Sequence, residues 1–212
     1  MNPVTPTSGA PLAADASRAP PLSHWRRYRA LYALIAVCLA PVIASYLAYY
    51  VFPPSGRTNY GDLIEPQRPV PALALKLNDG SGYDLKRLRG SWLMVKVDAA
   101  ACEQTCQQRL WLMRQLRTMT GKDADRIERV MLVTDAGPME TMLLREYDGT
   151  HFLRADRAEL ERLLPAEPGT RVEDYIYLVD PIGNLMMRWP RDADASRMKK
   201  DLSKLLKASR IG

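Results

Sequence analysis

The stretch that decides the fold is Trp92-Leu-Met-Val-Lys-Val97, together with the segment that follows it, Asp98-Ala-Ala-Ala-Cys102-Glu-Gln-Thr-Cys106. The first six residues are mostly apolar and predict a buried central strand, whereas Gln107 to Met119 has a helical pattern. A strand that runs into a helix places both cysteines at or near the helix N-terminus, where free backbone N–H groups and the helix dipole favour a thiolate. Two of the chain's three cysteines lie here, so this segment is the main candidate for chemistry.

Composition narrows the class of protein. The chain has 212 residues, of which 47% are hydrophobic and 25% charged, as is ordinary for a globular domain with an appended segment. The net charge of +6 comes from 30 basic and 24 acidic residues that are spread along the chain, and no dense basic block with interleaved aromatic residues occurs. This pattern argues against a nucleic-acid partner. Three cysteines are too few for a disulfide scaffold.

The N-terminal region predicts a tail and a membrane anchor. Residues 1–29 are predicted to form a disordered cytoplasmic tail, because the first 22 residues are rich in Pro, Ala, Ser and Thr. Residues 30–52 then carry no charge, and 23 residues give about 34 Å of helix, enough to span a hydrocarbon core of about 30 Å. A cleaved signal peptide is the alternative, but this run is longer than a signal-peptide core and no A-x-A site follows it.

The charges around the anchor predict its orientation. Four arginines precede the span, whereas Arg57, which follows it, is accompanied by Asp62 and Glu65. Excess basic charge marks the cytoplasmic side, so we expect the remainder of the chain to lie outside. Residues 53–69 are proline-rich and are predicted to be a semi-extended linker to a domain that covers residues 70–212.

The pattern of the external domain predicts a mixed α/β fold. Alternating leucines at 73–77 and the central strand 92–97 are followed by a helix to Met119, a second central strand at 126–134, and helices at 138–147 and 155–164. A hairpin at 175–179 and 185–189 and an amphipathic helix at 193–208 complete the chain. A right-handed crossover makes the first strand pair parallel and the hairpin makes the last pair antiparallel. We therefore predict a thioredoxin-like mixed sheet with flanking helices, preceded by one transmembrane helix.

Cys102 and Cys106 are four residues apart, which puts their Cα atoms about 6 Å apart on one helix face. This separation suits a disulfide and also lets two thiolates share one soft ion such as Cu(I). From the residues alone, redox or metal chemistry, a static disulfide and two inert thiols all stay open. Asp98, four residues before Cys102, is either a proton acceptor in thiol exchange or merely the end of the strand.

The chain resembles the Sco/SenC family of copper chaperones for cytochrome c oxidase. A single N-terminal anchor, a strand ending in C-x-x-x-C and the late motif Ile176-Tyr-Leu-Val-Asp-Pro-Ile-Gly183 carry the resemblance, which covers about residues 70–208. It implies that Cys102 and Cys106 are both the redox-active pair and the copper ligands, with Cu(I) as the metal. It also implies a bacterial inner-membrane protein with a periplasmic domain, and an oxidase subunit or other assembly factors as partners.

The chain also departs from the family pattern. Glu103 and Gln107 stand where the family usually has proline after each cysteine, and Val172 stands where it has a copper-binding histidine. His151 is expected to be a surface residue at the sheet edge. The carboxylates of Glu173 and Asp174 are hard donors and are expected to be solvated. The arginines of the helix after the cysteines, Arg109, Arg114 and Arg117, are expected to have no special role.

The predicted function is that of a membrane-anchored accessory protein in cytochrome c oxidase assembly, which uses the dithiol for thiol-disulfide chemistry or Cu(I) handling. One alternative is a general periplasmic thiol-disulfide oxidoreductase. The other is a non-catalytic assembly scaffold in which the cysteines form a structural disulfide. An enzymatic role, if there is one, is that of a thiol-disulfide oxidoreductase.

Overall fold

The computed structural model describes residues 24–51, 59–209 and 211 of the chain. These residues belong to two compact units, Met1–Gly56 and Arg57–Gly212. Most of the predicted disordered tail and the first part of the predicted linker, residues 53–58, lie outside the described residues. Each unit is considered by itself below.

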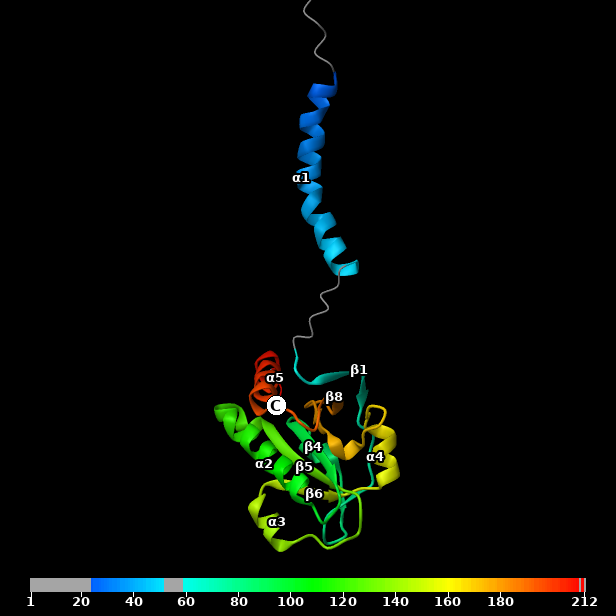
Figure 1. Ribbon diagram of the computed structural model, residues 1–212, viewed down its shortest axis with the longest axis vertical. Coiled ribbons are helices and arrows are strands. Elements are labelled where there is room, and N and C mark those ends of the chain that lie inside the picture. Colours follow the sequence, from blue (N-terminus) through cyan, green and yellow to red (C-terminus); the bar gives the residue numbers. More distant parts are fainter. Residues whose placement is uncertain (1–23, 52–58, 210, 212) are drawn as a thin grey trace, which may run out of the picture. The chain divides into compact units, whose positions relative to one another are not determined.

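The first unit consists of helix α1 (His24–Tyr50), with Pro41 inside it (Figure 1). By length and composition, Tyr28–Tyr50 is apolar enough to cross a membrane. These 23 residues overlap almost completely with the predicted anchor. Proline is tolerated inside a membrane helix because neighbouring groups can satisfy the freed backbone carbonyl.

The second unit is built on one mixed sheet with the order β1-β8-β7-β4-β5-β6-β2-β3. Strands β4, β5 and β6 are mutually parallel, and β7, β8 and β1 continue the sheet from β4 with antiparallel pairing. On the other side of the sheet, β2 pairs antiparallel with β6 and β3. The strands are β1 (Asp62–Pro69), β2 (Leu75–Lys76), β3 (Gly82–Tyr83), β4 (Trp92–Asp98), β5 (Ile127–Val133), β6 (Thr150–Arg154), β7 (Ile176–Val179) and β8 (Asn184–Trp189).

Helices cover both faces of this sheet, as the second unit in Figure 1 shows. Helices α2 (Gln104–Met119), α3 (Thr141–Glu146) and α5 (Ala195–Ala208) contribute to the core on one face, whereas α4 (Arg157–Leu163) contributes to the core on the other. Short 3-10 turns complete the domain: η1 (Leu85–Leu88), η2 (Gly121–Arg126) and η3 (Val172–Asp174).

Strand β4 contributes side chains to the two hydrophobic cores, one on each face of the sheet. Its side chains alternate, so that Trp92 and Met94 face the α2 side while Leu93, Val95 and Val97 face the α4 side. Both faces of the strand are buried, which is why its sequence reads as an almost continuous apolar run. The predicted thioredoxin-like mixed sheet with flanking helices is confirmed.

Three local expectations differ from the structure. The stretch 62–69, predicted as linker, is the edge strand β1, which tolerates prolines because one side of an edge strand needs no ladder hydrogen bonds. The sequence analysis did not expect β6, a short strand between two helices that pairs with β5. The helices predicted at 138–147 and 155–164 are shorter, Thr141–Glu146 and Arg157–Leu163.

Candidate functional site

Cys102 and Cys106 form a disulfide at the junction of β4 and α2, with their Cα atoms 5.1 Å apart. Cys106 is the third residue of α2, and Cys102 lies in the preceding turn with a φ of +36°, a left-handed backbone conformation that is uncommon outside glycine. In this turn the Cys102 N–H donates to the carbonyl of Ala99 at 3.1 Å, and the Gln107 side-chain amide donates to the Cys102 carbonyl at 3.0 Å. The turn therefore brings the first cysteine back over the start of the helix.

Both cysteines are buried: 0% of Cys102 and 2% of Cys106 is exposed. Cys102 nevertheless forms part of the wall of a cavity of about 260 Å³. The cavity therefore lies directly beside the residue that begins the disulfide, while the cysteine itself is closed off from solvent. The residues that line it come from the end of β4, the first half of α2, the start of α4, the η3 region and the segment after β8: Lys96, Asp98, Ala99, Ala101, Cys102, Glu103, Thr105, Arg109, Arg157, Arg171, Glu173, Asp174 and Arg191.

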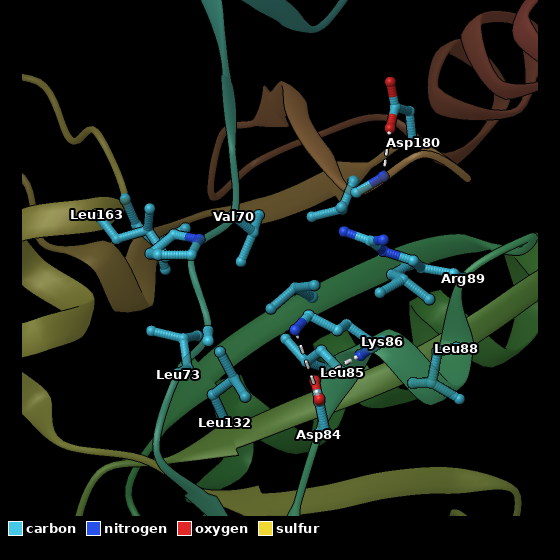
Figure 2. Close-up of a pocket in the computed structure, with 17 residues that line it drawn as sticks. Val70, Leu73, Asp84, Leu85, Lys86, Leu88, Arg89, Leu132, Leu163 and Asp180 are labelled. Carbon is cyan, nitrogen blue, oxygen red and sulfur yellow. Dashed lines mark hydrogen bonds and ion pairs between the residues drawn. The ribbon is translucent and has the colours of Figure 1, made fainter.

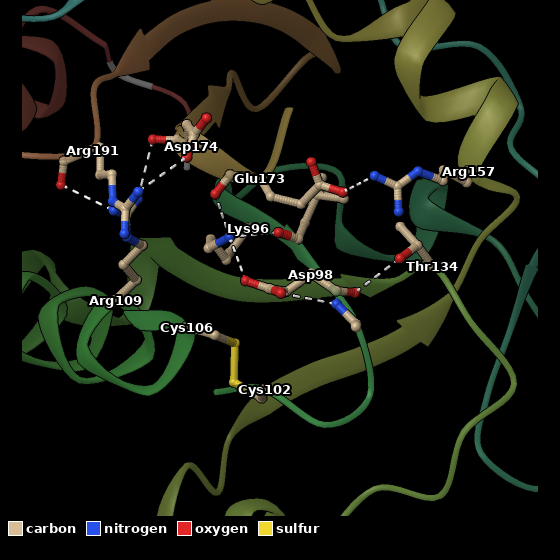
Figure 3. Close-up of polar contacts among 12 residues, drawn as sticks. Lys96, Asp98, Cys102, Cys106, Arg109, Thr134, Arg157, Glu173, Asp174 and Arg191 are labelled. Atoms are coloured by element: carbon tan, nitrogen blue, oxygen red, sulfur yellow. Dashed lines mark hydrogen bonds and ion pairs between the residues drawn. A yellow bond between two sulfur atoms is a disulfide. The ribbon is translucent and has the colours of Figure 1, made fainter. Parts of the chain in front are cut away.

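Lys96 is the most deeply buried charged group of this wall. It lies on the same face of β4 as Met94, and its ammonium group donates to Asp98 Oδ2 at 2.9 Å and to the Glu173 carbonyl at 2.7 Å (Figure 3). It also donates to the Val97 carbonyl. Burial lowers the pKa of Lys96, although the nearby Asp98 carboxylate acts in the opposite direction.

Arg109 forms another part of the wall. Only 8% of it is exposed, and its guanidinium donates to two backbone carbonyls, those of Asp174 and Arg191, at 3.1 Å each. Burial lowers the pKa of Arg109, and the positive charge of Arg191 lowers it further. The sequence analysis assigned Arg109 no special role, but its position three residues after Cys106 puts it on the inner face of α2.

The acidic residues of the wall are mostly occupied by basic partners. Glu173 pairs through Oε1 with Arg157, and Asp174 has an oxygen 3.9 Å from Arg191. The Glu173 side chain is 10% exposed, and its Oε2 accepts no hydrogen bond from the part of the chain that the structure describes. The expectation that Glu173 is solvated is therefore wrong, while Asp174 is half-buried.

The sequence analysis did not single out four basic residues of this site, and it assigned Arg109 no special role; the four are Lys96, Arg157, Arg171 and Arg191. The signal for Lys96 is a single cation within an apolar central strand, which is rare unless its charge is paired. The signal for Arg109 is its helical spacing from Cys106.

The other predicted candidates lie away from the disulfide or are apolar. His151 is on β6, with Nε2 3.3 Å from Glu128 Oε2, and it does not line the cavity. Val172, at the position of the family histidine, is buried in the core on the α4 side of the sheet. Among the described residues, no three His, Cys, Asp or Glu side chains are arranged to hold a metal ion.

A second cavity, of about 60 Å³, lies between the α4 side of the sheet and the segments around β2 and η1 (Figure 2). Its wall is mostly aliphatic, with Leu85, Leu132 and Leu163 among the lining residues. The charged Asp84 and Asp180 accept hydrogen bonds from backbone N–H groups of their own turns. This cavity brings no reactive groups together, so the cavity beside the disulfide is the candidate functional site.

A disulfide at the carboxyl end of a central parallel strand, followed directly by a helix, defines a thioredoxin-like protein. The chain belongs to the family described as "Transmembrane-like, thioredoxin-like, C-terminal domain", which matches residues 92–209, more than half of the chain. No curated protein matches the chain.

Solved structures of the Sco type share this fold. Yeast Sco1 with copper bound has 17% identity and a TM-score of 0.52, and the match covers 68% of this chain and 91% of that one. ScoI of Arabidopsis thaliana with copper bound has 14% identity and a TM-score of 0.50, with coverage of 67% and 100%. A SCO1/SenC family lipoprotein from Bacillus anthracis has 13% identity and a TM-score of 0.50, with coverage of 67% and 98%. The Sco/SenC resemblance of the sequence is confirmed at the level of the fold.

Proposed function

We propose that this protein is a membrane-anchored, Sco-like accessory protein of respiratory cytochrome c oxidase assembly that acts by thiol-disulfide exchange at Cys102 and Cys106. In this proposal α1 anchors the chain in a bacterial inner membrane, with the N-terminus in the cytoplasm and the thioredoxin-like domain in the periplasm. An oxidase subunit or another assembly factor is the expected partner.

The observation that carries the proposal is the cavity beside Cys102. A purely structural disulfide needs no open volume beside it, whereas an exchanging disulfide must admit a thiolate to one sulfur. Because Cys102 lines the cavity and Cys106 does not, Cys102 Sγ is the expected point of attack. Cys106 then leaves as a thiolate in the first turn of α2, where the helix dipole and free N–H groups stabilise negative charge.

Copper handling by Cys102 and Cys106 has less support than thiol-disulfide exchange. Once reduced, two thiolates suffice to bind Cu(I), a soft ion. The position of the family histidine is the buried Val172, and the cations Lys96 and Arg109 line the adjoining cavity, which opposes the entry of a metal cation. We therefore expect Cu(I) binding to the reduced protein and no stoichiometric Cu(II) binding.

The test of thiol exchange uses the full chain in an uncharged detergent. The disulfide is equilibrated with mixtures of reduced and oxidised dithiothreitol, and the fraction reduced is measured by thiol alkylation. A reversible two-electron transition, together with reduction of a partner protein disulfide that is lost in Cys102→Ser and Cys106→Ser variants, is the expected result. A disulfide that stays oxidised until the domain unfolds would favour the structural scaffold instead.

Two further measurements separate the alternatives. Copper binding is tested by titration of the reduced chain with Cu(I) and with Cu(II), and the double Ser variant is the control. Absence of Cu(I) binding would contradict a copper-handling role. Oxidase assembly in cells that carry the double Ser variant tests the role of the pair. Normal assembly with a folded double variant would contradict the proposed role, and a defect in many disulfide proteins would point to a general oxidoreductase.

A further inference from the structure

The cavity beside Cys102 carries more positive than negative charge. Five basic and four acidic residues line it, and three of the acidic ones lie within 4 Å of a basic partner. Lys96 pairs with Asp98 at 2.9 Å, and Arg157 pairs with Glu173. The contact between Arg191 and Asp174 is long, at 3.9 Å, and more than half of the Arg191 side chain is exposed.

Two guanidinium groups of the wall have no carboxylate partner within salt-bridge distance in the described part of the chain. Arg109 is bound only by backbone carbonyls, which accept hydrogen bonds without neutralising its charge. Arg171 is exposed at the N-cap of η3, and its hydrogen bonds with Asp174 are made by its backbone: its N–H donates to Asp174 Oδ2 at 3.0 Å, and its carbonyl accepts from the Asp174 N–H at 2.9 Å. The remaining acidic residue, Glu103, is exposed at the N-cap of α2.

We infer that this cavity binds a small thiol that carries a carboxylate group and presents its sulfur to the Cys102–Cys106 disulfide. The guanidinium groups of Arg171 and Arg191 hold the carboxylate near the opening, since arginine binds carboxylates through paired, charge-assisted hydrogen bonds. A volume of about 260 Å³ fits a molecule of metabolite size, because pockets for drug-sized ligands begin at about 300 Å³. The inference rests on the proposed exchange function and names the class of its reductant.

The exchange balances with two thiols. The first thiolate attacks Cys102 Sγ, so that a mixed disulfide with Cys102 forms and the bond to Cys106 breaks, releasing the Cys106 thiolate. A second thiolate attacks the sulfur of the bound thiol and releases the Cys102 thiolate and a small-molecule disulfide. The protein gains two electrons, the two small thiols lose them, and the protein thiolates take up protons from solvent.

The test measures how the charge of the thiol affects the rate of disulfide reduction. The full chain in uncharged detergent is reduced with mercaptoacetate, 2-mercaptoethanol or cysteamine, which are anionic, neutral and cationic beside the thiol. For each thiol, the rate of reduction of the protein is expressed per thiolate present. It is then divided by the rate at which the same thiol reduces an uncharged small disulfide, bis(2-hydroxyethyl) disulfide. We expect this rate ratio to be about tenfold higher for mercaptoacetate than for 2-mercaptoethanol, which is the scale of a hydrogen bond to a charged group. The ratio for cysteamine is expected to be lower than that for 2-mercaptoethanol. High salt is expected to reduce the preference.

Variants locate the source of the preference. Most of the preference for mercaptoacetate over 2-mercaptoethanol is expected to be lost in Arg171→Ala and in Arg191→Ala. Part of this preference is expected to remain in Arg171→Lys. Arg145→Ala removes the same charge from the exposed surface of α3, outside the cavity wall, and is expected to keep it. An equal loss in Arg145→Ala would assign the effect to overall charge and overturn the inference.

The outcomes separate this inference from the proposed function. If all three thiols reduce the folded protein with the relative rates seen for the reference disulfide, the carboxylate site is wrong while thiol exchange stands. If none of them reduces the folded protein, both are wrong.

Discussion

Charged side chains are buried in two regions of the thioredoxin-like domain, and the two regions use them differently. Asp201 of α5 is 2% exposed and accepts hydrogen bonds from the N–H groups of Tyr60 and Gly61 and from the indole of Trp189, at 2.8 to 3.3 Å. These donors tie the chain before β1 to α5 and β8. In the second region, Lys96 and Arg109 are also buried but form part of the wall of a cavity beside a disulfide.

The comparison shows that burial of a charge does not by itself mark a functional site. Around Asp201 the partners are neutral donors of the protein itself, so the group acts as a fixed structural link. Beside Cys102, guanidinium groups without a carboxylate partner adjoin open volume and a bond that can be broken. The open volume and the reactive bond, together with the charges, distinguish the candidate site from the structural one.

The largest effect is expected at the structural link. Asp201→Ala leaves several buried donors without an acceptor and should lower the free energy of unfolding by about 3 to 5 kcal/mol. Urea denaturation of the full chain in detergent, followed by tryptophan fluorescence, measures this loss. Asp125→Ala removes a carboxylate that is 97% exposed and should leave the midpoint unchanged. If the folded Asp201 variant also exchanged its disulfide at an altered rate, the two regions would not be independent.

Lys96→Met should have the next largest effect, a loss of about 2 to 3 kcal/mol. The substitution leaves Asp98 without its partner and deprives two carbonyls of a donor. The same unfolding measurement applies, and an unchanged or higher stability would mean that the pair does not stabilise the β4–η3 junction.

The pH dependence of this pair has a defined sign. Because burial lowers the pKa of Lys96 below its ordinary value of 10.5, the unfolded chain holds this proton at alkaline pH values at which the folded chain releases it. The contribution of Lys96 to stability therefore rises with pH from its folded-state pKa towards 10.5. The difference in unfolding free energy between the wild type and Lys96→Met, measured across this range, should increase; a constant or falling difference would contradict the assigned direction.

Reduction of the disulfide should lower stability by about 2 kcal/mol, the value expected for a loop of roughly five residues. The loss should appear as faster hydrogen exchange in residues 98–106, with little change around β1 and α5. A Cys38→Ser background removes the remaining free thiol without touching the pair. Faster exchange around Asp201 after reduction would show that the disulfide stabilises the whole domain.

The smallest effect is expected at Gly61, beside the structural link. A Cβ at this position would lie 2.7 Å from both Met187 Sδ and Trp189 Nε1, so Gly61→Ala should destabilise the domain by about 1 to 2 kcal/mol. Gly82→Ala is the matched control, since no atom lies within 4 Å of a Cβ there. Thermal unfolding of both variants gives the comparison, and equal midpoints would mean that Met187 and Trp189 move aside freely.

Much of the fold was predictable because it depends on local patterns. The apolar run of β4, the hairpin of β7 and β8 and the amphipathic face of α5 each leave a periodic signal in the sequence. Strands β1 and β6 leave weak signals, since β1 contains prolines and β6 is only five residues long. Their pairing partners decide that they are strands, and those partners are distant in the sequence.

The sequence by itself determined the mixed thioredoxin-like sheet, the apolar N-terminal helix and the placement of Cys102 and Cys106 where a strand meets a helix. Spacing left open whether these cysteines are bonded, and no local pattern showed the charges around them. Only the tertiary structure decided that the pair is a buried disulfide and that Lys96, Arg109 and Arg171 meet at one cavity beside it. The physical reason is that periodicity records which face of an element is buried, whereas a site depends on which side chains distant elements bring together.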